Sequence, residues 1–190
     1  MKKFELTAEF VTNVFGKKLF RIKALVAFGD VEKGELGGFI EKEDNISHSG
    51  NAWVSGNAQV SGDAQVSGDA WVSGDAQVSG DARVSGNAQV YGNAQVSGDA
   101  QVSGDARVSG NADFAVVTGF GRYFRATTFF CCKDKILRVQ CGCFYGDLAQ
   151  FREIVKKTHG VSKYAKEYLA IADLMELHFS DEEEKQEADE

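Results

Sequence analysis

The chain has 190 residues, with 21 Lys and Arg against 28 Asp and Glu, so its formal net charge at pH 7 is −7. It contains 21 glycines and no proline, which argues against a collagen-like chain or a Pro-rich linker. It has no apolar run of about 18 residues and no apolar signal stretch at its start. We therefore expect no membrane span, a cytoplasmic location and four reduced cysteines.

The charge is distributed unevenly along the chain. Residues 1–49 sum to zero, 50–113 to −5, 114–180 to +4 and 181–190 to −6. No block is basic enough to indicate a nucleic-acid-binding domain. These shifts predict a cap at 1–49, a repeat domain at 50–113, a basic module at 114–180 and a disordered acidic tail at 181–190.

The N-terminal block predicts β structure. Residues 19–28 alternate as a strand, and the turn signal at 16–18 predicts a hairpin with residues 10–15. His48 occupies the slot that holds valine in the later repeats, so we expect an irregular first coil there rather than a ligand site. The block is expected to cap the open end of the domain that follows.

Between residues 50 and 113 one pattern, Val-Ser-Gly-(Asn or Asp)-Ala-x, recurs with a strict hexad period. A fixed short period of this kind indicates a solenoid. Ala-x-Val-Ser fits a short strand with Ala and Val on one face, and Gly followed by Asn or Asp fits a corner. Three such edges would close a triangular coil, so that one coil takes three hexads, with valine and alanine pointing inward.

The uninterrupted hexads resemble the hexapeptide-repeat left-handed β-helix, and the left hand of the coil is what that resemblance implies. The flanks resemble those of small hexapeptide-repeat proteins from phages and prophages, which implies a phage or prophage origin. The segments that carry this second resemblance are residues 36–41, 119–122, 127–130 and 141–146.

Stacking every third hexad predicts columns of outward-facing side chains. One column reads Trp53, Trp71, Gln89, Arg107; the others read Gln59, Gln77, Gln95, Asp113 and Gln65, Arg83, Gln101. Both tryptophans are expected to point outward near Tyr91, and exposed aromatic side chains favour a contact surface. The alternative is that flanking segments of the same chain cover them.

The C-terminal block predicts a ββαα module. A hairpin is expected over residues 124–132 and 136–143, turning at 133–135. Asp147 with Gln150 forms a capping box for a first helix that Gly160 ends, and Ser162 can cap a second helix. The overall fold class is therefore mainly β: a left-handed parallel β-helix with an N-terminal β cap and a C-terminal ββαα module.

The cysteine pattern invites a zinc interpretation that the hairpin argues against. With the turn at 133–135, Cys141 lies opposite Thr127 or Thr128, roughly 10 Å from Cys131. Zinc thiolates need bonds of about 2.3 Å. We predict no metal and no cofactor.

Basic side chains gather near the same hairpin. Arg122, Arg125 and Lys135, with the hydroxyl of Thr127, predict a site for an anionic ligand or an acidic protein surface. The alternatives are a solvated charged face, or neutralisation by the acidic tail.

These observations predict a non-catalytic, phage-type binding protein that blocks or sequesters a host bacterial component. The target would be a defence-system protein or its anionic signal. The chain is expected to form a homo-oligomer, a trimer before a dimer. The alternatives are an enzyme like the hexapeptide-repeat acyltransferases, whose histidine base the repeat lacks, and a purely structural scaffold. The expected contact residues are Trp53, Trp71, Tyr91, Arg107, Arg122, Arg125, Thr127 and Lys135.

Overall fold

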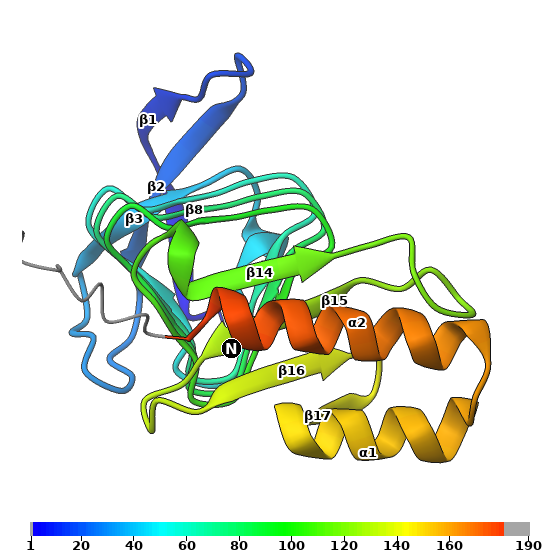
Figure 1. The fold of residues 1–190 in the computed structure, drawn as a ribbon. Helices are drawn as coiled ribbons and strands as arrows, with labels where there is room; N and C mark the ends of the chain where they lie inside the picture. Colours follow the sequence, from blue (N-terminus) through cyan, green and yellow to red (C-terminus); the bar gives the residue numbers. More distant parts are fainter. Residues whose placement is uncertain (1, 181–190) are drawn as a thin grey trace, which may run out of the picture.

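The computed structural model describes residues 2–180 of the chain. A β-solenoid lies between an N-terminal set of strands and a C-terminal module of four strands and two helices (Figure 1). This confirms the predicted mainly β fold with a parallel solenoid at its centre. The predicted disordered tail, residues 181–190, lies outside the described residues.

The solenoid is built from two-residue strands, one in each hexad. Strands three hexads apart pair in parallel, as Trp53 does with Trp71 and Gln59 with Gln77. Three faces result, in the orders β4-β7-β10-β13, β5-β8-β11 and β6-β9-β12. The strands are β4 (Trp53–Val54), β5 (Gln59–Val60), β6 (Gln65–Val66), β7 (Trp71–Val72), β8 (Gln77–Val78), β9 (Arg83–Val84), β10 (Gln89–Val90), β11 (Gln95–Val96), β12 (Gln101–Val102) and β13 (Arg107–Val108).

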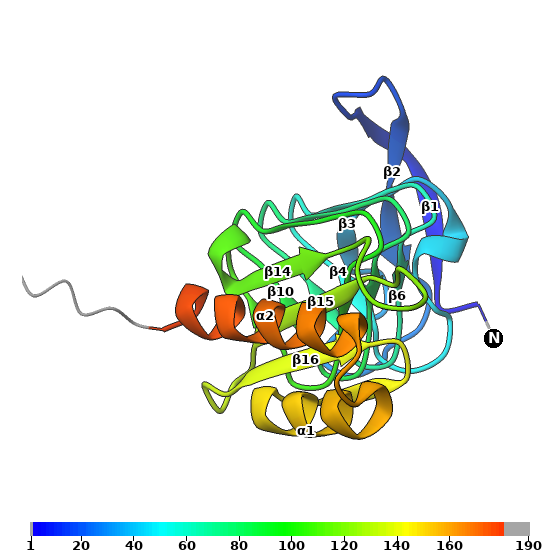
Figure 2. The same cartoon turned by 45° about the vertical axis from the view of Figure 1, so that its right-hand side comes forward.

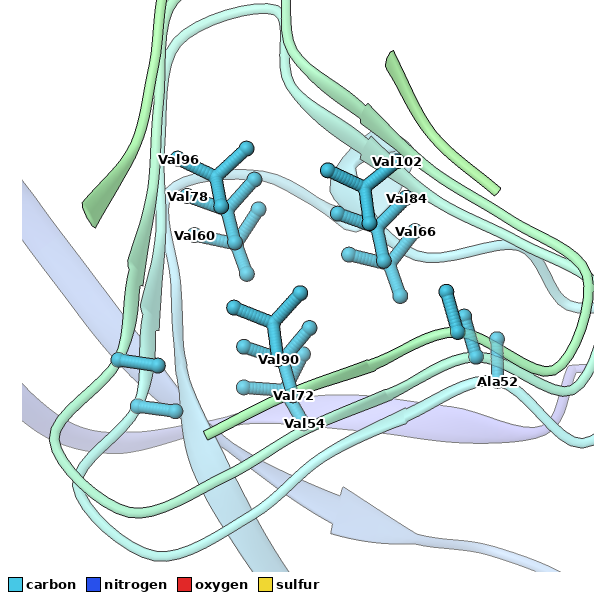
Figure 3. Close-up of a cluster of buried hydrophobic side chains, with 14 of the residues drawn as sticks. Ala52, Val54, Val60, Val66, Val72, Val78, Val84, Val90, Val96 and Val102 are labelled. Atoms are coloured by element: carbon cyan, nitrogen blue, oxygen red, sulfur yellow. The ribbon is translucent and has the colours of Figure 1, made fainter. Parts of the chain in front are cut away.

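Valine and alanine fill the interior of the coil. All the valines and alanines of the repeat from Ala52 to Val108 have no exposed surface, and the valines form three stacks, one from each side of the triangle (Figure 3). Each buried valine contributes about 1.5 kcal/mol or more of hydrophobic free energy. The corners need glycine: Gly86 has φ +68°, and a Cβ there would lie 2.9 Å from the backbone nitrogen of Gly104.

The N-terminal strands extend one face of the solenoid. β1 (Phe4–Thr12), β2 (Lys18–Ala24) and β3 (Leu36–Ile40) are antiparallel, and β3 then pairs in parallel with β5. This confirms the predicted hairpin, which projects from the solenoid (Figures 1 and 2). The second strand is shorter than predicted, because the chain leaves the sheet after Ala24 and residues 25–35 form a loop.

The first coil is irregular, as expected. Ile46 bridges Val66 after a 3₁₀ turn η1 (Glu43–Asn45), and this spacing is wider than the three hexads that separate partners within the repeat. The His48 ring stacks on Phe4 at 4.5 Å between centroids, and its Nδ1 accepts a hydrogen bond from the backbone N–H of Lys3. His48 therefore joins the first coil to the start of β1.

At the other end, the 3₁₀ turn η2 (Asn111–Asp113) stops the solenoid. Asp113 was expected to continue a column of outward glutamines. Instead its carboxylate accepts hydrogen bonds from the backbone N–H groups of Ser109 and Gly110. The last hexad of the sequence pattern, which contains Asp113, therefore forms no strand of the solenoid.

The C-terminal module contains two strands more than predicted. The expected hairpin is β15 (Thr127–Cys131) with β16 (Leu137–Cys141), and β14 (Phe114–Val117) and β17 (Phe144–Asp147) complete a sheet in the order β14-β15-β16-β17. Helix α1 (Leu148–His159) begins and ends as predicted, with the Asp147–Gln150 capping box and Gly160, and α2 (Lys163–His178) begins at the predicted Ser162 cap. The module is ββββαα rather than ββαα.

This sheet separates two cores. Phe130 and Cys132 face the solenoid interior, whereas Phe129 and Val139 pack with the helices. The β14–β17 sheet therefore closes the C-terminal end of the solenoid and carries α1 and α2 on its outer face (Figure 2). Neither helix in the described part of the chain is long and apolar enough to cross a membrane.

Candidate binding sites

The two tryptophans of the predicted contact column have different environments. Trp53 was expected to point into solvent, but its side chain is completely buried. Its ring makes edge contacts with Phe28 and Phe4, at 5.4 and 6.4 Å between centroids. The loop at residues 25–35 and the start of β1 thus cover Trp53, which removes it from the set of residues that can contact a partner.

The rest of that column borders an open groove. Trp71, Tyr91 and Arg107 line a groove of about 720 Å³ on the β4-β7-β10-β13 face. Asp30 and Glu35, from the N-terminal loop, also line it. The structure therefore brings together three of the predicted contact residues and adds two carboxylates that the sequence did not associate with them. Ser73 and Gln89 complete the lining.

A second, smaller cavity of about 220 Å³ lies in the C-terminal module. Arg122 and Arg125 line it, as does Tyr123 between them. The aromatic and aliphatic side chains of the helices form most of the remaining wall. The other lining residues are Cys141, Cys143, Phe144, Phe151, Ile154, Val155, Thr158, His159 and Tyr168.

Both arginines are available to a ligand. Their guanidinium carbons lie over the Tyr123 ring, 5.5 Å from its centroid for Arg122 and 5.1 Å for Arg125. Neither arginine forms a salt bridge with an acidic side chain within residues 2–180. Both are exposed, so an anion at this cavity would meet two positive charges without displacing a salt-bridge partner from the described residues.

The loop that carries these arginines is anchored to α2. The backbone N–H of Gly121 donates to Glu167 Oε2 at 3.0 Å, and this hydrogen bond is the main cause of the lowered pKa of the Glu167 carboxyl. Phe124 adopts a positive φ of +52° while remaining largely exposed. Such strain in a non-glycine residue is concentrated at binding and switch segments.

The floor of the cavity combines polar contacts with aromatic rings. Burial, together with the neighbouring Cys141 thiol, raises the pKa of Tyr168 to about 12, so its hydroxyl stays protonated at neutral pH. The His159 ring lies 5.7 Å from the Tyr168 ring between centroids. The Tyr168 hydroxyl is therefore a neutral hydrogen-bond donor at this cavity, beside the His159 ring.

Thr127 and Lys135 were expected to share a site with Arg122 and Arg125, but neither lines the arginine cavity. The Thr127 side chain is buried, and its hydroxyl donates to Cys141 Sγ at 3.2 Å. Lys135 lies in the turn after β15, at the opposite end of that strand from Arg125. Arg138, also near the turn, pairs with Asp134 at 2.7 Å. The predicted basic cluster is thus divided between the two ends of the hairpin.

The strand register confirms the predicted pairing of Cys141 with Thr127. Thr127 pairs with Cys141 and Cys131 with Leu137, so the two cysteine pairs occupy different ends of the hairpin. Within residues 2–180, no three His, Cys, Asp or Glu side chains are grouped so that they could hold a metal ion.

Sequence reasoning missed most of the cavity wall. His159 ends α1 and Tyr168 lies in α2, and the sequence pattern connected neither residue with the arginines. The fold makes the connection, because the loop before β15 and the end of α1 meet beside the β16–β17 turn. The only local sign of the cavity in the sequence was Tyr123, which lies between Arg122 and Arg125.

Comparison with known families agrees with the central domain. A family model described as the YdcK beta solenoid repeat matches residues 76–92 and 100–112. A search of curated proteins returned no match. The matched segments lie on β8–β10 and β12–β13, so the comparison and the structure together identify the chain as a protein containing a β-solenoid repeat.

Proposed function

We propose that this chain is a non-catalytic, phage-type binding protein that acts inside a bacterial host and sequesters a small anionic ligand. The observation that supports this most directly is the pair of guanidinium groups of Arg122 and Arg125 at an aromatic-lined cavity, neither of which forms a salt bridge within residues 2–180. A signal molecule of a host defence system is a ligand of this kind. Removing it from solution requires affinity and no chemistry.

The lining indicates what the ligand contains. Arginine binds phosphate in a bidentate fashion. The other aromatic rings that line the cavity, those of Phe144, Phe151 and His159, can pack against a planar ring. Pockets that enclose whole drug-sized ligands are about 300–1,000 Å³. The 220 Å³ cavity is smaller, so we infer that a ring enters it while one or more phosphates stay outside against the arginines. A nucleotide has this layout.

We further propose that the protein works as a homo-oligomer, a trimer before a dimer. The burial of Trp53 weakens one reason for this expectation. The proposal now depends on the resemblance to hexapeptide-repeat proteins. Light scattering at micromolar concentration tests it, and a mass of 20.6 kDa, that of one chain, would contradict it.

Isothermal titration with nucleoside monophosphates, cyclic dinucleotides and the matching uncharged nucleosides tests the ligand class. We expect binding that needs the phosphate and weakens as salt is added. Arg122→Gln and Arg125→Gln should each reduce affinity about tenfold or more, at an unchanged melting temperature. Lys135→Gln, an exposed charge at the far end of the hairpin, is the matched control. Equal losses in all three variants, or no phosphate-dependent binding, would contradict the proposal.

A further inference from the structure

The groove beside Trp71 is separate from the arginine cavity and supports an inference of its own. We propose that it binds an extended segment of a partner protein, with a basic side chain facing Asp30 and Glu35 and an acidic side chain facing Arg107. The segment would run along the solenoid axis, over the rings of Trp71 and Tyr91. Nothing in this proposal depends on the ligand of the other site.

The departures from the repeat are the first observation. The solenoid needs Val and Ala at the buried positions and Gly at the corners. The outward-facing positions can hold other residues without disturbing the coil. The outward slot after each valine, from Ser55 to Ser109, holds serine in every hexad but one, where it holds Tyr91. The outward slot before each valine holds glutamine except at Trp53, Trp71, Arg83 and Arg107.

Three of these departures meet in one place. Trp71, Tyr91 and Arg107 come from successive coils and line the same groove. Trp53 is accounted for by its packing under the N-terminal loop. Arg83 belongs to the β6-β9-β12 face. Trp71, Tyr91 and Arg107, which depart from the repeat, thus line the same groove as Asp30 and Glu35 of the N-terminal loop.

The floor of the groove is aromatic and held in place. Trp71 Nε1 donates to Ser55 Oγ at 3.0 Å, which fixes the indole against the preceding coil. Tyr91 stands one coil further along and is 37% exposed. Aromatic rings with little freedom are the side chains that dominate binding energy at protein interfaces.

The groove has opposite charges at its two ends. Asp30 and Glu35 lie on the loop that covers Trp53, and neither forms an ion pair within residues 2–180. Arg107 lies two coils beyond Trp71, or about 10 Å at the usual strand spacing. Its Nη1 donates to Gln89 Oε1 at 2.6 Å, which leaves further N–H groups for a carboxylate.

This charge layout favours a peptide over a sugar. Side chains of an extended chain alternate between its two faces at about 3.3 Å per residue, so two side chains that both face the groove are separated by an even number of positions, two or four. A basic and an acidic side chain at that separation would each meet the opposite charge, and the intervening residues would cover the rings. A neutral saccharide would use the rings but leave both charged ends without partners.

An array of short peptides, each with one Lys or Arg and one Asp or Glu at every separation from one to five positions, tests the proposal. We expect binding to be strongest at an even separation, two or four, because only then do both charged side chains face the groove. Tyr91→Ser and Arg107→Gln should each weaken it about tenfold or more. Both substitutions restore the residue found in that slot elsewhere, so the solenoid should fold, and Arg83→Gln is the matched control on another face.

Trp71 provides the readout in solution, because Trp53 is buried. Titration of the selected peptide should change the tryptophan fluorescence, and Asp30→Asn in the exposed loop should weaken the response. If Arg107→Gln fails to fold, the fluorescence responses of Asp30→Asn and Tyr91→Ser to the peptide still test the proposal. Binding that ignores charge separation, or that survives both of these variants, would overturn the proposal. Selective binding to a glycan array with no binding to the peptides would overturn it as well.

Discussion

Trp53 and Trp71 are direct register partners on neighbouring coils, yet one is completely buried and the other lines an open groove. The difference lies outside the repeat. Phe28 packs edge-on against Trp53, 5.4 Å between ring centroids, whereas the indole of Trp71 is held by Ser55 on one side. Trp53 therefore stabilises the fold, whereas Trp71 is accessible to a partner in the groove.

Replacing these two rings should have unequal effects on stability. Trp53→Ala should lower the free energy of unfolding by about 4 kcal/mol, because it leaves a cavity beneath the cap. Trp71→Gln should cost less than about 1 kcal/mol, since the repeat uses Gln in that slot. Urea unfolding of both variants checks this. Trp53→Phe, which keeps most of the ring contacts, should lie between them, and equal costs for the first two would contradict the assignment.

The loop beside the arginine cavity should depend on Gly121. A Cβ at this position would overlap the hydroxyl of Tyr168, and φ is +73°. We expect Gly121→Ala to displace the loop, cost about 3 kcal/mol and weaken ligand binding, because strain and overlap act together. Gly119→Ala is the control: φ is +84° but a Cβ there meets no atom within 4 Å, so only strain of about 1 kcal/mol is expected. Similar losses for both variants in thermal melts would argue against the contact with Tyr168.

Asn45 should anchor the start of the solenoid. Its buried amide donates to the carbonyls of Gly62 and Ala64, and its oxygen accepts from the N–H of Lys42. Asn45→Ala leaves these groups without a partner and should cost about 3 kcal/mol. Asn57→Ala removes a bond to Asp75 at an exposed corner and should cost less than about 0.5 kcal/mol. Chemical denaturation of the pair distinguishes them, and a small loss at Asn45 would contradict its anchoring role.

Lys3 should make stability depend on alkaline pH. Its Nζ donates to the carbonyls of Gly50 and Ala52, and burial lowers its pKa from 10.5 to about 8, with a smaller opposing effect of Asp69. Between these two values the unfolded chain binds more protons than the folded one, so the contribution of Lys3 to the free energy of unfolding rises with pH. Below about 8 and above 10.5 it is constant.

Urea unfolding of the wild type and of Lys3→Met, at several pH values across that window, isolates this contribution. The difference in unfolding free energy between the two proteins should change in favour of the wild type as pH rises. Other groups that titrate in the window affect both proteins alike. Parallel curves would mean that Lys3 titrates normally in the folded state.

The parts of the fold that the sequence could predict are those set by local rules. The three-hexad register from Trp53 to Arg107 follows from the hexad period, and the ends of α1 follow from Asp147 and Gly160. The burial of Trp53 could not be predicted, because the same slot is open to solvent wherever no loop covers it. β14 and β17 were missed because each is short and depends on pairing with the hairpin. The position of Lys135 was misjudged because closeness along the chain was taken for closeness in space.

The constant length of the hexads also fixes the rotation of one end of the molecule relative to the other about the solenoid axis. Because three hexads complete a coil, inserting three more would move the C-terminal module about 4.8 Å along the axis and leave it facing the same way. Inserting a single hexad would instead turn it by a third of a revolution, since each hexad forms one side of the triangle. The arginine cavity would then point in a new direction relative to the loop at residues 25–35. The number of hexads thus sets both the distance between the two surfaces along the solenoid axis and their relative orientation about it.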